Sequence, residues 1–380
     1  MEFTLNEEQD MLKTMARDFL ENECPKTYVR AMMEDEVGHT PELWKKMADV
    51  GWLGLNFPEE YGGAGMSFRD LTILFEEMGR AVMPGPFLST MVLSAMPILD
   101  AGTEEQKQEY LPKIASGEAV FTLAALEEDG DLWPGGINMR AFEQGDAYVL
   151  TGTKMFVPDA KAADYMIVAA RTERCEDPKD GITLFIVDAR EWGIYIKALK
   201  TMDETRKQYD VVFNQMAVPA RNILGEVNKG WQIIENMIPK AVTALCAELV
   251  GGEEWILETS VQYAKDRVQF GVPIGSFQVI KHKAAEMYCE LEYARTLMEW
   301  AAEAIREESQ DAAIAASMAK SYCGDASKLI ADHGVQIHGG IGFTWDHDMH
   351  IYFKRTRAND TAFGDSHYHR SLIADYLERF

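Results

Sequence analysis

The sequence has no apolar run long enough to cross a membrane. A spanning helix needs roughly 18 to 20 mostly apolar residues, and no run comes near that length although 47% of the residues are hydrophobic. The first twenty residues, MEFTLNEEQDMLKTMARDFL, also lack the basic and apolar segments of a secretory signal, and they show no transit peptide. We therefore expect a cytoplasmic protein with no membrane span.

Cysteine is scarce, and its pattern argues against disulfides and zinc. The five cysteines are odd in number and show no C-x-x-C spacing, which favours reduced thiols. Two pairs of histidines lie close in sequence, His347 with His350 and His367 with His369. No set of carboxylates or cysteines completes a list of metal ligands beside them. We therefore assign these histidines to surface or hydrogen-bonding roles and expect no metal.

Positive charge is in the minority. With 37 Lys and Arg against 62 Asp and Glu, the formal net charge is −25, which opposes binding to nucleic acid. A phosphorylated cofactor can still bind where a few cations gather locally. Candidates for such a group lie in the C-terminal third: Arg267, Lys281, Lys283, Lys354, Arg355 and Arg357.

The spacing of apolar residues changes along the chain and predicts three segments. A chain of this length is also expected to form more than one hydrophobic core. Residues 1–118 repeat apolar residues at helical spacing, and residues 119–225 hold short β-branched and aromatic runs separated by Gly, Asp, Pro and Lys. Residues 226–380 return to long helical periods, typical of a bundle. The connector 219–231 marks the clearest boundary, and there is no internal repeat, low-complexity segment or coiled-coil heptad.

A helical pattern from Tyr263 to Met287 is interrupted at Gly271-Val272-Pro273. Pro cannot continue a helix and Gly permits backbone angles that other residues resist, so the residues just before the break should lie on a fixed corner. Those residues are Arg267, Gln269 and Phe270. A guanidinium suits a phosphate and an aromatic ring can cover a base. The alternative is a plain helical hairpin with a salt-bridged Arg.

Six sequence blocks are spread over nearly the whole chain: R-x-Q-F-G-x-P-I-x-x-F-Q from Arg267, and the blocks at 58–65 with 76–80, 101–107 with 111–112, 152–157, 218–225 and 336–342. Taken in their order along the chain, they resemble the acyl-CoA dehydrogenase family. The resemblance implies an α+β fold with an N-terminal helical domain, a middle β-domain and a C-terminal four-helix bundle. It also implies FAD as the cofactor.

The resemblance carries over to individual cofactor residues. It places Arg267, Gln269 and Phe270 at the pyrophosphate and adenine end of FAD, and Gln336, Gly339 and Gly340 on the loop that completes that end. In the family one chain lends part of this site to its neighbour, which implies a homotetramer or heterotetramer. At the flavin ring, Glu127-Glu128-Asp129-Gly130 replaces the family's Thr-Glu-Pro-Gly, so Glu128 keeps only backbone contacts. Phe156 packs on the ring, while Pro158 lacks the hydroxyl and N–H of the family's Thr.

The catalytic base departs from the family pattern. Members use a Glu to remove a proton from the carbon beside the thioester carbonyl while hydride passes to the flavin. Alignment puts Phe363 at its usual position and Ala241 at the alternative one. Asp365, two residues from the first position, is the nearest acid and our candidate base, with a helix cap or turn as its structural alternative. Two more distant acids are Glu248, two helical turns from Ala241, and Asp100 at the end of a helix.

We therefore expect an FAD-dependent enzyme that dehydrogenates an acyl-CoA thioester and passes electrons to an electron-transferring flavoprotein. Two variants stay open: a base-deficient subunit of a heteromeric enzyme, and an enzyme for a cyclic or branched acyl group with an unusual base. A non-enzymatic helical scaffold is a third, more distant alternative.

Overall fold

The computed structural model describes residues 5–128, 130 and 133–378. The chain packs into two compact units, each assembled from separate stretches of sequence. The first comprises Met1–Arg30, Phe68–Met83 and Val242–Phe380, and the second comprises Ala31–Ser67 and Pro84–Ala241. Each unit is described by itself below.

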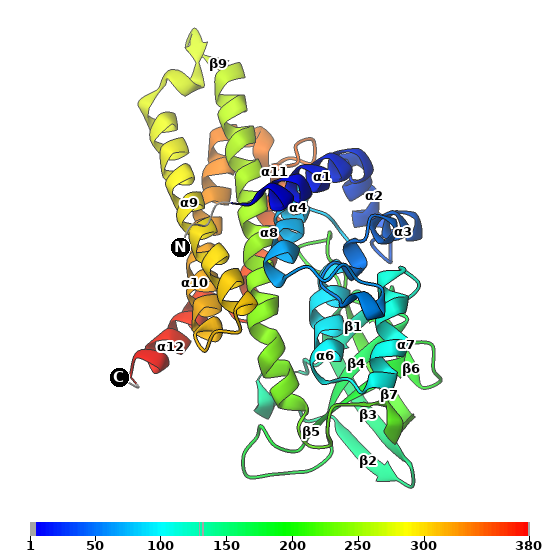
Figure 1. Cartoon of the computed structure of the whole chain (residues 1–380). Helices are drawn as coiled ribbons and strands as arrows, with labels where there is room; N and C mark the ends of the chain where they lie inside the picture. Colours follow the sequence, from blue (N-terminus) through cyan, green and yellow to red (C-terminus); the bar gives the residue numbers. More distant parts are fainter. Residues whose placement is uncertain (1–4, 129, 131–132, 379–380) are drawn as a thin grey trace. The chain divides into compact units, whose positions relative to one another are not determined.

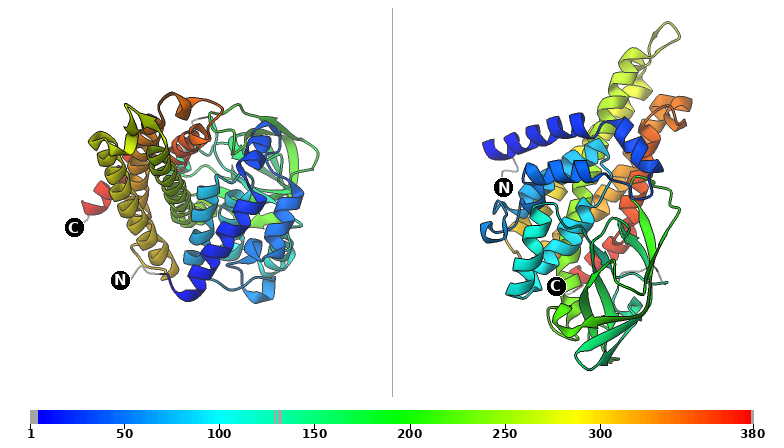
Figure 2. Two further views of the ribbon diagram at one scale, coloured as in Figure 1. Left: turned by 90° about the horizontal axis from the view of Figure 1, so that it is seen from above. Right: turned by 90° about the vertical axis from the view of Figure 1, so that its right-hand side faces the viewer.

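The first unit is helical (Figure 1). Its helices are α1 (Glu7–Glu23), α4 (Phe68–Ala81), α8 (Gly230–Asp266, from Val242 on), α9 (Gln278–Arg306), α10 (Ala312–His338), α11 (Met349–Thr361) and α12 (Ser366–Leu377). Helices α9 and α10 run side by side, and α1 lies along α4 (Figure 2). The buried residues of α9 include Met287, Leu291, Ala294 and Met298, spaced three or four apart, so one face of this helix is apolar and packs inward.

Two glycines allow α4 and α8 to touch backbone to backbone. A Cβ added at Gly79 would lie 2.1 Å from the carbonyl oxygen of Glu248, and one added at Gly251 would lie 1.8 Å from that of Glu76. Real side chains cannot approach so closely, so any larger residue would separate the two helices.

The second unit combines short helices with a sheet. The helices are α3 (Pro41–Asp49), α5 (Phe87–Thr90), α6 (Met96–Ala101) and α7 (Glu104–Ala115); α2 (Lys26–Glu34) spans the boundary between the units. Residues Met91–Ala95 between α5 and α6 form a π-helical turn, so the helical stretch from α5 through α6 is continuous but not regular. Helix α7 begins with a capping box in which Thr103 and Gln106 each satisfy the other's backbone N–H.

Eight strands form one mixed sheet. They are β1 (Phe121–Ala124), β2 (Arg140–Gln144), β3 (Ala147–Pro158), β4 (Tyr165–Arg171), β5 (Ile182–Asp188), β6 (Ile194–Ala198), β7 (Gln208–Pro219) and β8 (Ile223–Leu224). Their order is β6-β7-β3-β2-β4-β5-β8, with β1 parallel to β4. Buried and less buried residues alternate along most of β7, so one face of this strand meets the core.

The fold class expected from the sequence is confirmed: helices, then a β-region, then long helices. The longest strands, β3 and β7, lie within the region 119–225 where the sequence predicts strands. Strands β1, β2 and β8 are two to five residues long and carry no clear alternation, so the sequence pattern does not single them out. The three domain boundaries stay a prediction, since the two units follow packing rather than chain order.

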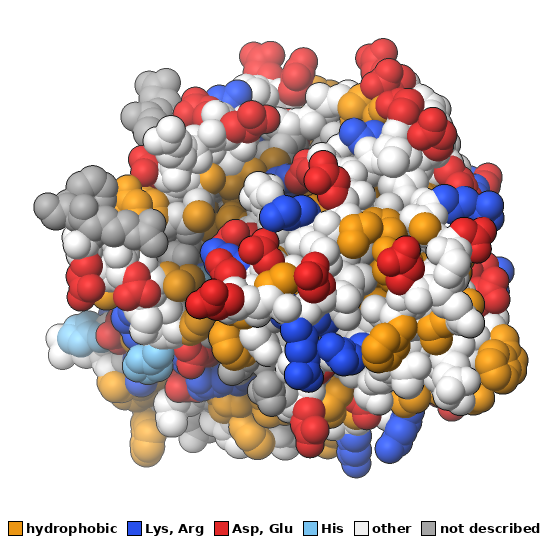
Figure 3. Space-filling model, turned by 90° about the horizontal axis from the view of Figure 1, so that it is seen from below, with side chains coloured by type: hydrophobic (Ala, Val, Ile, Leu, Met, Phe, Trp, Pro, Cys, Tyr) orange, Lys and Arg blue, Asp and Glu red, His pale blue; other side chains and the backbone are white. Residues whose placement is uncertain are grey.

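The surface mixes charges of both signs. On the face shown in Figure 3, acidic side chains are scattered among basic and hydrophobic ones, and some Lys and Arg side chains lie together. A chain of net charge −25 therefore still presents local groups of cations. Within the described part of the chain, no helix combines the length and the apolar character that crossing a membrane requires.

Candidate active site

The expected corner after α8 is a tight β-hairpin. Helix α8 ends at Asp266, and the two-residue strands β9 (Val268–Gln269) and β10 (Val272–Pro273) pair antiparallel. Phe270 and Gly271 form the turn with φ angles of +54° and +80°, the pattern of a type I′ hairpin. The N–H of Ile274 donates to the carbonyl oxygen of Arg267 at 2.8 Å, which ties the hairpin to its base. The predicted break is therefore confirmed.

The side chains of this hairpin are presented outward. Phe270 is 92% exposed, and its ring forms a T-shaped pair with that of Phe277, with centroids 6.1 Å apart. Arg267 and Gln269 are exposed as well. Among the described residues, the Arg267 guanidinium makes no hydrogen bond or ion pair, so the salt-bridged alternative is not what the structure shows. A free guanidinium on a fixed turn suits an anionic ligand.

The second predicted cofactor segment follows α10. Gln336, Gly339 and Gly340 are all exposed. Gly339 has φ +63° and ψ −142°, a conformation that residues with a side chain avoid. A Cβ placed on Gly339 or Gly340 would meet no atom within 4 Å, so their backbone is open to approach from outside.

The two segments begin beside each other, at a contact that the sequence did not indicate. The ring of Tyr263, one turn before Arg267, stacks on the ring of His338 with centroids 4.4 Å apart. The Nδ1–H of His338 donates to the carbonyl oxygen of Gly334 at 2.8 Å, and within the described chain Nε2 has no partner. Burial lowers the pKa of His338, which keeps the ring neutral. The only sequence signal was its place inside Gln-Ile-His-Gly-Gly.

These residues fit the phosphate end of FAD. The hairpin offers an unpaired cation, and the glycine loop offers backbone without side chains, which are the two features that bind a pyrophosphate. Arg267, Gln269 and Phe270 would hold that end from the hairpin. Gln336, Gly339 and Gly340 would do so from the loop.

In the second unit, Phe156, the residue predicted to contact the flavin ring, lies at an irregular point of β3. It lies in β3 where the pairing with β7 shifts register between Lys154 and Val157, its φ is +50°, and 44% of it is exposed. The irregularity turns this aromatic side chain out of the sheet. Glu128 is exposed on the loop after β1, while Asp129 of the same block lies outside the described residues.

A buried ion pair holds the loop that carries Glu128. Lys154 is fully buried, and its Nζ donates to Glu127 Oε1 at 2.7 Å and to the carbonyl oxygen of Ala125 at 3.1 Å. The Glu127 carboxylate also accepts from the N–H of Met139 at 2.8 Å. Burial lowers the pKa of Lys154 to about 8. Neither residue was identified as functional from the sequence, although Lys154 lies within one of the matching blocks.

Phe363, which the sequence predicts at the family's usual base position, is held in a strained conformation. Its φ is +58°, unusual for an aromatic residue. His369 Nε2 donates to the Phe363 carbonyl oxygen at 3.0 Å, which fixes this backbone. Burial lowers the pKa of His369 to about 4, so its ring is neutral near neutral pH.

Asp365 begins α12 as its N-cap. Its Oδ1 accepts a hydrogen bond of 2.9 Å from the N–H of Tyr368. This bond is the main reason that the pKa of Asp365 is lowered, and a carboxylate with a lowered pKa is a weaker proton acceptor. The geometry matches the capping alternative, while the role of Asp365 as a base stays a prediction.

The other two acids considered as candidate bases, Glu248 and Asp100, also interact with neighbouring residues. Glu248 is 6% exposed and accepts from Asn359 Nδ2 at 2.9 Å, with Arg355 Nη1 at 3.5 Å. Asp100 pairs with Lys240 at 2.6 Å. Both carboxylates therefore already have partners within the chain.

Comparison with known proteins identifies the family. The descriptions Acyl-CoA dehydrogenase, N-terminal domain, middle domain and C-terminal domain match residues 6–118, 123–216 and 228–377. The chain is 30% identical to the caffeyl-CoA reductase-Etf complex subunit CarC of Acetobacterium woodii, covering 98% of each chain. The chain therefore belongs to the acyl-CoA dehydrogenase family, whose members are flavin oxidoreductases that act on CH–CH bonds.

Two solved structures show the same likeness across the whole chain. Butyryl-CoA dehydrogenase from Megasphaera elsdenii superposes with a TM-score of 0.92 at 28% identity, covering 99% of this chain and 100% of that one. The ChsE4-ChsE5 complex from Mycobacterium tuberculosis gives a TM-score of 0.89 at 26% identity, covering 100% of each chain. The fold expected from the sequence is therefore shared over its full length.

Proposed function

We propose that this chain binds FAD and acts on the CH–CH bond of an acyl-CoA thioester. The observation that carries the proposal is the hairpin after α8, where Arg267 is exposed and unpaired beside the strained, exposed Phe270. A non-enzymatic scaffold would gain nothing from holding an aromatic side chain in water at a positive φ. The family membership supplies the substrate class.

The roles of the chain's own residues follow from their positions. Arg267 would pair with pyrophosphate oxygens, and Gly339 and Gly340 would let the backbone approach them. Phe156 would pack against the ring system, and the Lys154–Glu127 pair would keep the loop of Glu128 in place. When bound, FAD would accept the hydride.

The source of the base decides between two versions of this function. Phe363 and Ala241 carry no acid, and Asp365 and Glu248 are engaged in a cap and in a buried network. We propose that a partner chain supplies the proton-accepting group and that this chain is one subunit of a heteromeric acyl-CoA dehydrogenase. The similarity to a complex named for two proteins, ChsE4 and ChsE5, supports this version. In the other version, Asp365 takes the proton.

An electron-transferring flavoprotein is the proposed redox partner. The relative from Acetobacterium woodii is named as a subunit of a reductase-Etf complex. A tetramer, with identical or different chains, is proposed from the same resemblance.

The decisive experiment is to purify the chain alone and together with candidate partner chains encoded beside it. The complex should be yellow, and a panel of CoA thioesters should bleach its flavin absorbance. Bleaching that occurs only with the partner present supports the heteromeric version, whereas rapid bleaching of the isolated chain supports an internal base such as Asp365. A protein that remains colourless after reconstitution with FAD would overturn both versions.

A further inference from the structure

The contact between Tyr263 and His338 belongs to a cluster of three rings in the first unit. His338 stacks on Tyr263 with centroids 4.4 Å apart, and His347 tilts against His338 with centroids 4.6 Å apart. Tyr263 lies near the end of α8, His338 is the last residue of α10, and His347 lies two residues before α11. The ring cluster, Tyr263 with His338 and His347, therefore joins three segments that are distant in sequence.

The ring of His338 is fixed by its surroundings. It is 3% exposed, and its Nδ1–H donates to the carbonyl oxygen of Gly334 at 2.8 Å. A Cβ added at Gly342 would lie 2.8 Å from the Cβ of His338, so the glycine loop folds back against this residue. His347 Nδ1 accepts from the N–H of Met349 at 3.1 Å, which ties the third ring to the start of α11. Burial lowers the pKa of both imidazoles, so the rings meet uncharged near neutral pH.

Each side of the stack carries a residue predicted to bind the cofactor. The N–H of Arg267 donates to the carbonyl oxygen of Tyr263 at 2.8 Å, so the hairpin cation lies one helical turn from the first ring. Gly339 follows His338 directly, and its N–H is bonded to carbonyl oxygens of the last turn of α10. The stack of Tyr263 on His338 therefore sets the spacing between the exposed guanidinium and the open backbone of the glycine loop.

Fixed spacing matters where two segments bind one ligand. A pyrophosphate that is held by a cation from one segment and by backbone from another loses a contact when either segment moves. Binding is tighter when the two segments are already in place, because less ordering remains for the binding step. A ring that joins the segments can therefore affect affinity without touching the ligand.

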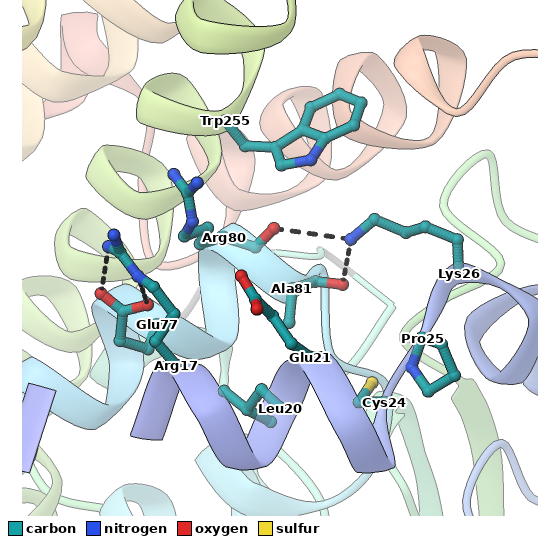
Figure 4. A pocket seen from close by; sticks show the side chains of 10 residues that line it. All are labelled: Arg17, Leu20, Glu21, Cys24, Pro25, Lys26, Glu77, Arg80, Ala81 and Trp255. Atoms are coloured by element: carbon teal, nitrogen blue, oxygen red, sulfur yellow. Dashed lines mark hydrogen bonds and ion pairs between the residues drawn. The ribbon is translucent and has the colours of Figure 1, made fainter. Parts of the chain in front are cut away.

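The enclosed pocket of the same unit shows the opposite situation (Figure 4). It measures about 230 Å³, and none of its lining residues belongs to the hairpin or the glycine loop. Arg17 forms a two-point ion pair with Glu77, at 2.9 and 2.7 Å, and Lys26 Nζ donates to the carbonyl oxygen of Ala81 at 2.7 Å. These cations are bound within the chain and stabilise its packing, so Arg17 provides a control for stability alone.

We propose that His338 is a positioning residue of the cofactor site: its stack on Tyr263 holds the glycine loop at a fixed distance from Arg267. The inference rests on the proposed binding of FAD and adds that the hairpin and the loop act as one unit. Removing either ring should weaken FAD binding although every group that would contact the cofactor is still present.

The test titrates apoprotein variants with FAD and measures their chemical denaturation in parallel. His338→Asn keeps an N–H donor near the place of Nδ1 but lacks the ring, and Tyr263→Leu removes the other ring while keeping apolar volume. Each should raise the dissociation constant for FAD about tenfold, the upper range for a lost aromatic pair. His338→Phe restores a ring and should recover part of the loss. Arg17→Ala should lower stability and leave FAD affinity unchanged.

A double-mutant cycle with Arg267→Ala separates positioning from plain packing. If His338 acts by holding the loop relative to Arg267, His338→Asn should cost little further affinity once the guanidinium is absent. Tyr263→Leu carries the same cycle if His338→Asn does not fold. Losses of affinity that simply add, or unchanged FAD affinity in the ring variants, would overturn the inference. A wild-type protein that binds no FAD would overturn the proposed function, and this inference with it.

Discussion

Phe270 and Phe363 both have a strained backbone conformation, but their surroundings differ. Phe270 at the hairpin has φ +54° and Phe363 before α12 has φ +58°. Phe270 is 92% exposed beside the unpaired Arg267, whereas the carbonyl of Phe363 is pinned by His369 and the next acid caps a helix. The strain alone therefore does not mark a ligand site. The polar groups beside it do, because only unpaired groups can still bind something.

The largest effect is expected from placing an acid at residue 363. Phe363→Glu places a carboxylate at the predicted base position, and Glu meets no greater backbone penalty there than Phe, because neither is branched at Cβ. Flavin reduction of the isolated chain by a straight-chain CoA thioester should rise by about 10²-fold or more, followed by stopped-flow absorbance. Phe363→Gln, which has the same shape but cannot accept a proton, is the control. An equal gain in both variants would show that the pocket, and not the base, had changed.

The next largest effect is expected from removing the cation of the hairpin, Arg267. Arg267→Ala should weaken FAD binding by about 1.5 to 3 kcal/mol, because a charged hydrogen bond to phosphate is lost. Arg267→Lys should recover part of this loss, since an ammonium keeps the charge without the planar fork. Titration of the apoprotein with FAD measures both. Arg357, which is partly exposed and pairs with Asp332 at 2.7 Å, is the matched control, and its Ala variant should bind FAD normally. Unchanged affinity in Arg267→Ala would remove the hairpin from the cofactor site.

Relieving the backbone strain at Phe270 and at Phe363 should affect FAD binding differently. Asn tolerates positive φ better than Phe, so Phe270→Asn and Phe363→Asn should each relieve roughly 1 kcal/mol of backbone strain, offset at Phe363 by lost packing. Only Phe270→Asn should weaken FAD binding, because only that ring is presented to a ligand. Chemical denaturation and FAD titration of both variants test this comparison. Equal losses of FAD affinity would mean that the two segments do not differ as the structure indicates.

The smallest effect concerns the cap of α12. Asp365→Ala should destabilise the protein by about 1 kcal/mol at neutral pH, while Asp365→Asn should change little, since Asn caps equally well. The folded-state pKa of Asp365 is lowered, so its stabilising effect is present above the ordinary carboxyl pKa and is lost as the pH falls through the lowered value. The difference between wild type and Asp365→Ala should therefore shrink in acid. If Asp365→Asn instead slowed flavin reduction by about 10²-fold, Asp365 would be the base.

Much of the fold follows from local patterns. The helix break at Gly271 and Pro273 is visible in sequence because it depends on two residues with special backbone behaviour. The main strands follow from β-branched and aromatic runs, and the missed ones are short enough that pairing with neighbours, as in β1 with β4, decides them. The cofactor segments were located through the resemblance, yet their contact through Tyr263 and His338 joins residues 75 apart along the chain.

The sequence alone determined that the chain has the family's blocks in order, and it predicts that Phe363 and Ala241 stand where an acid is customary. Those facts depend on residue identity at single positions. Only the tertiary structure decided which charged groups are paired and which are free: Glu248 is engaged by Asn359, whereas Arg267 is unpaired among the described residues. Whether a charged group is buried or paired depends on partners contributed by distant parts of the chain, and folding alone brings those partners together.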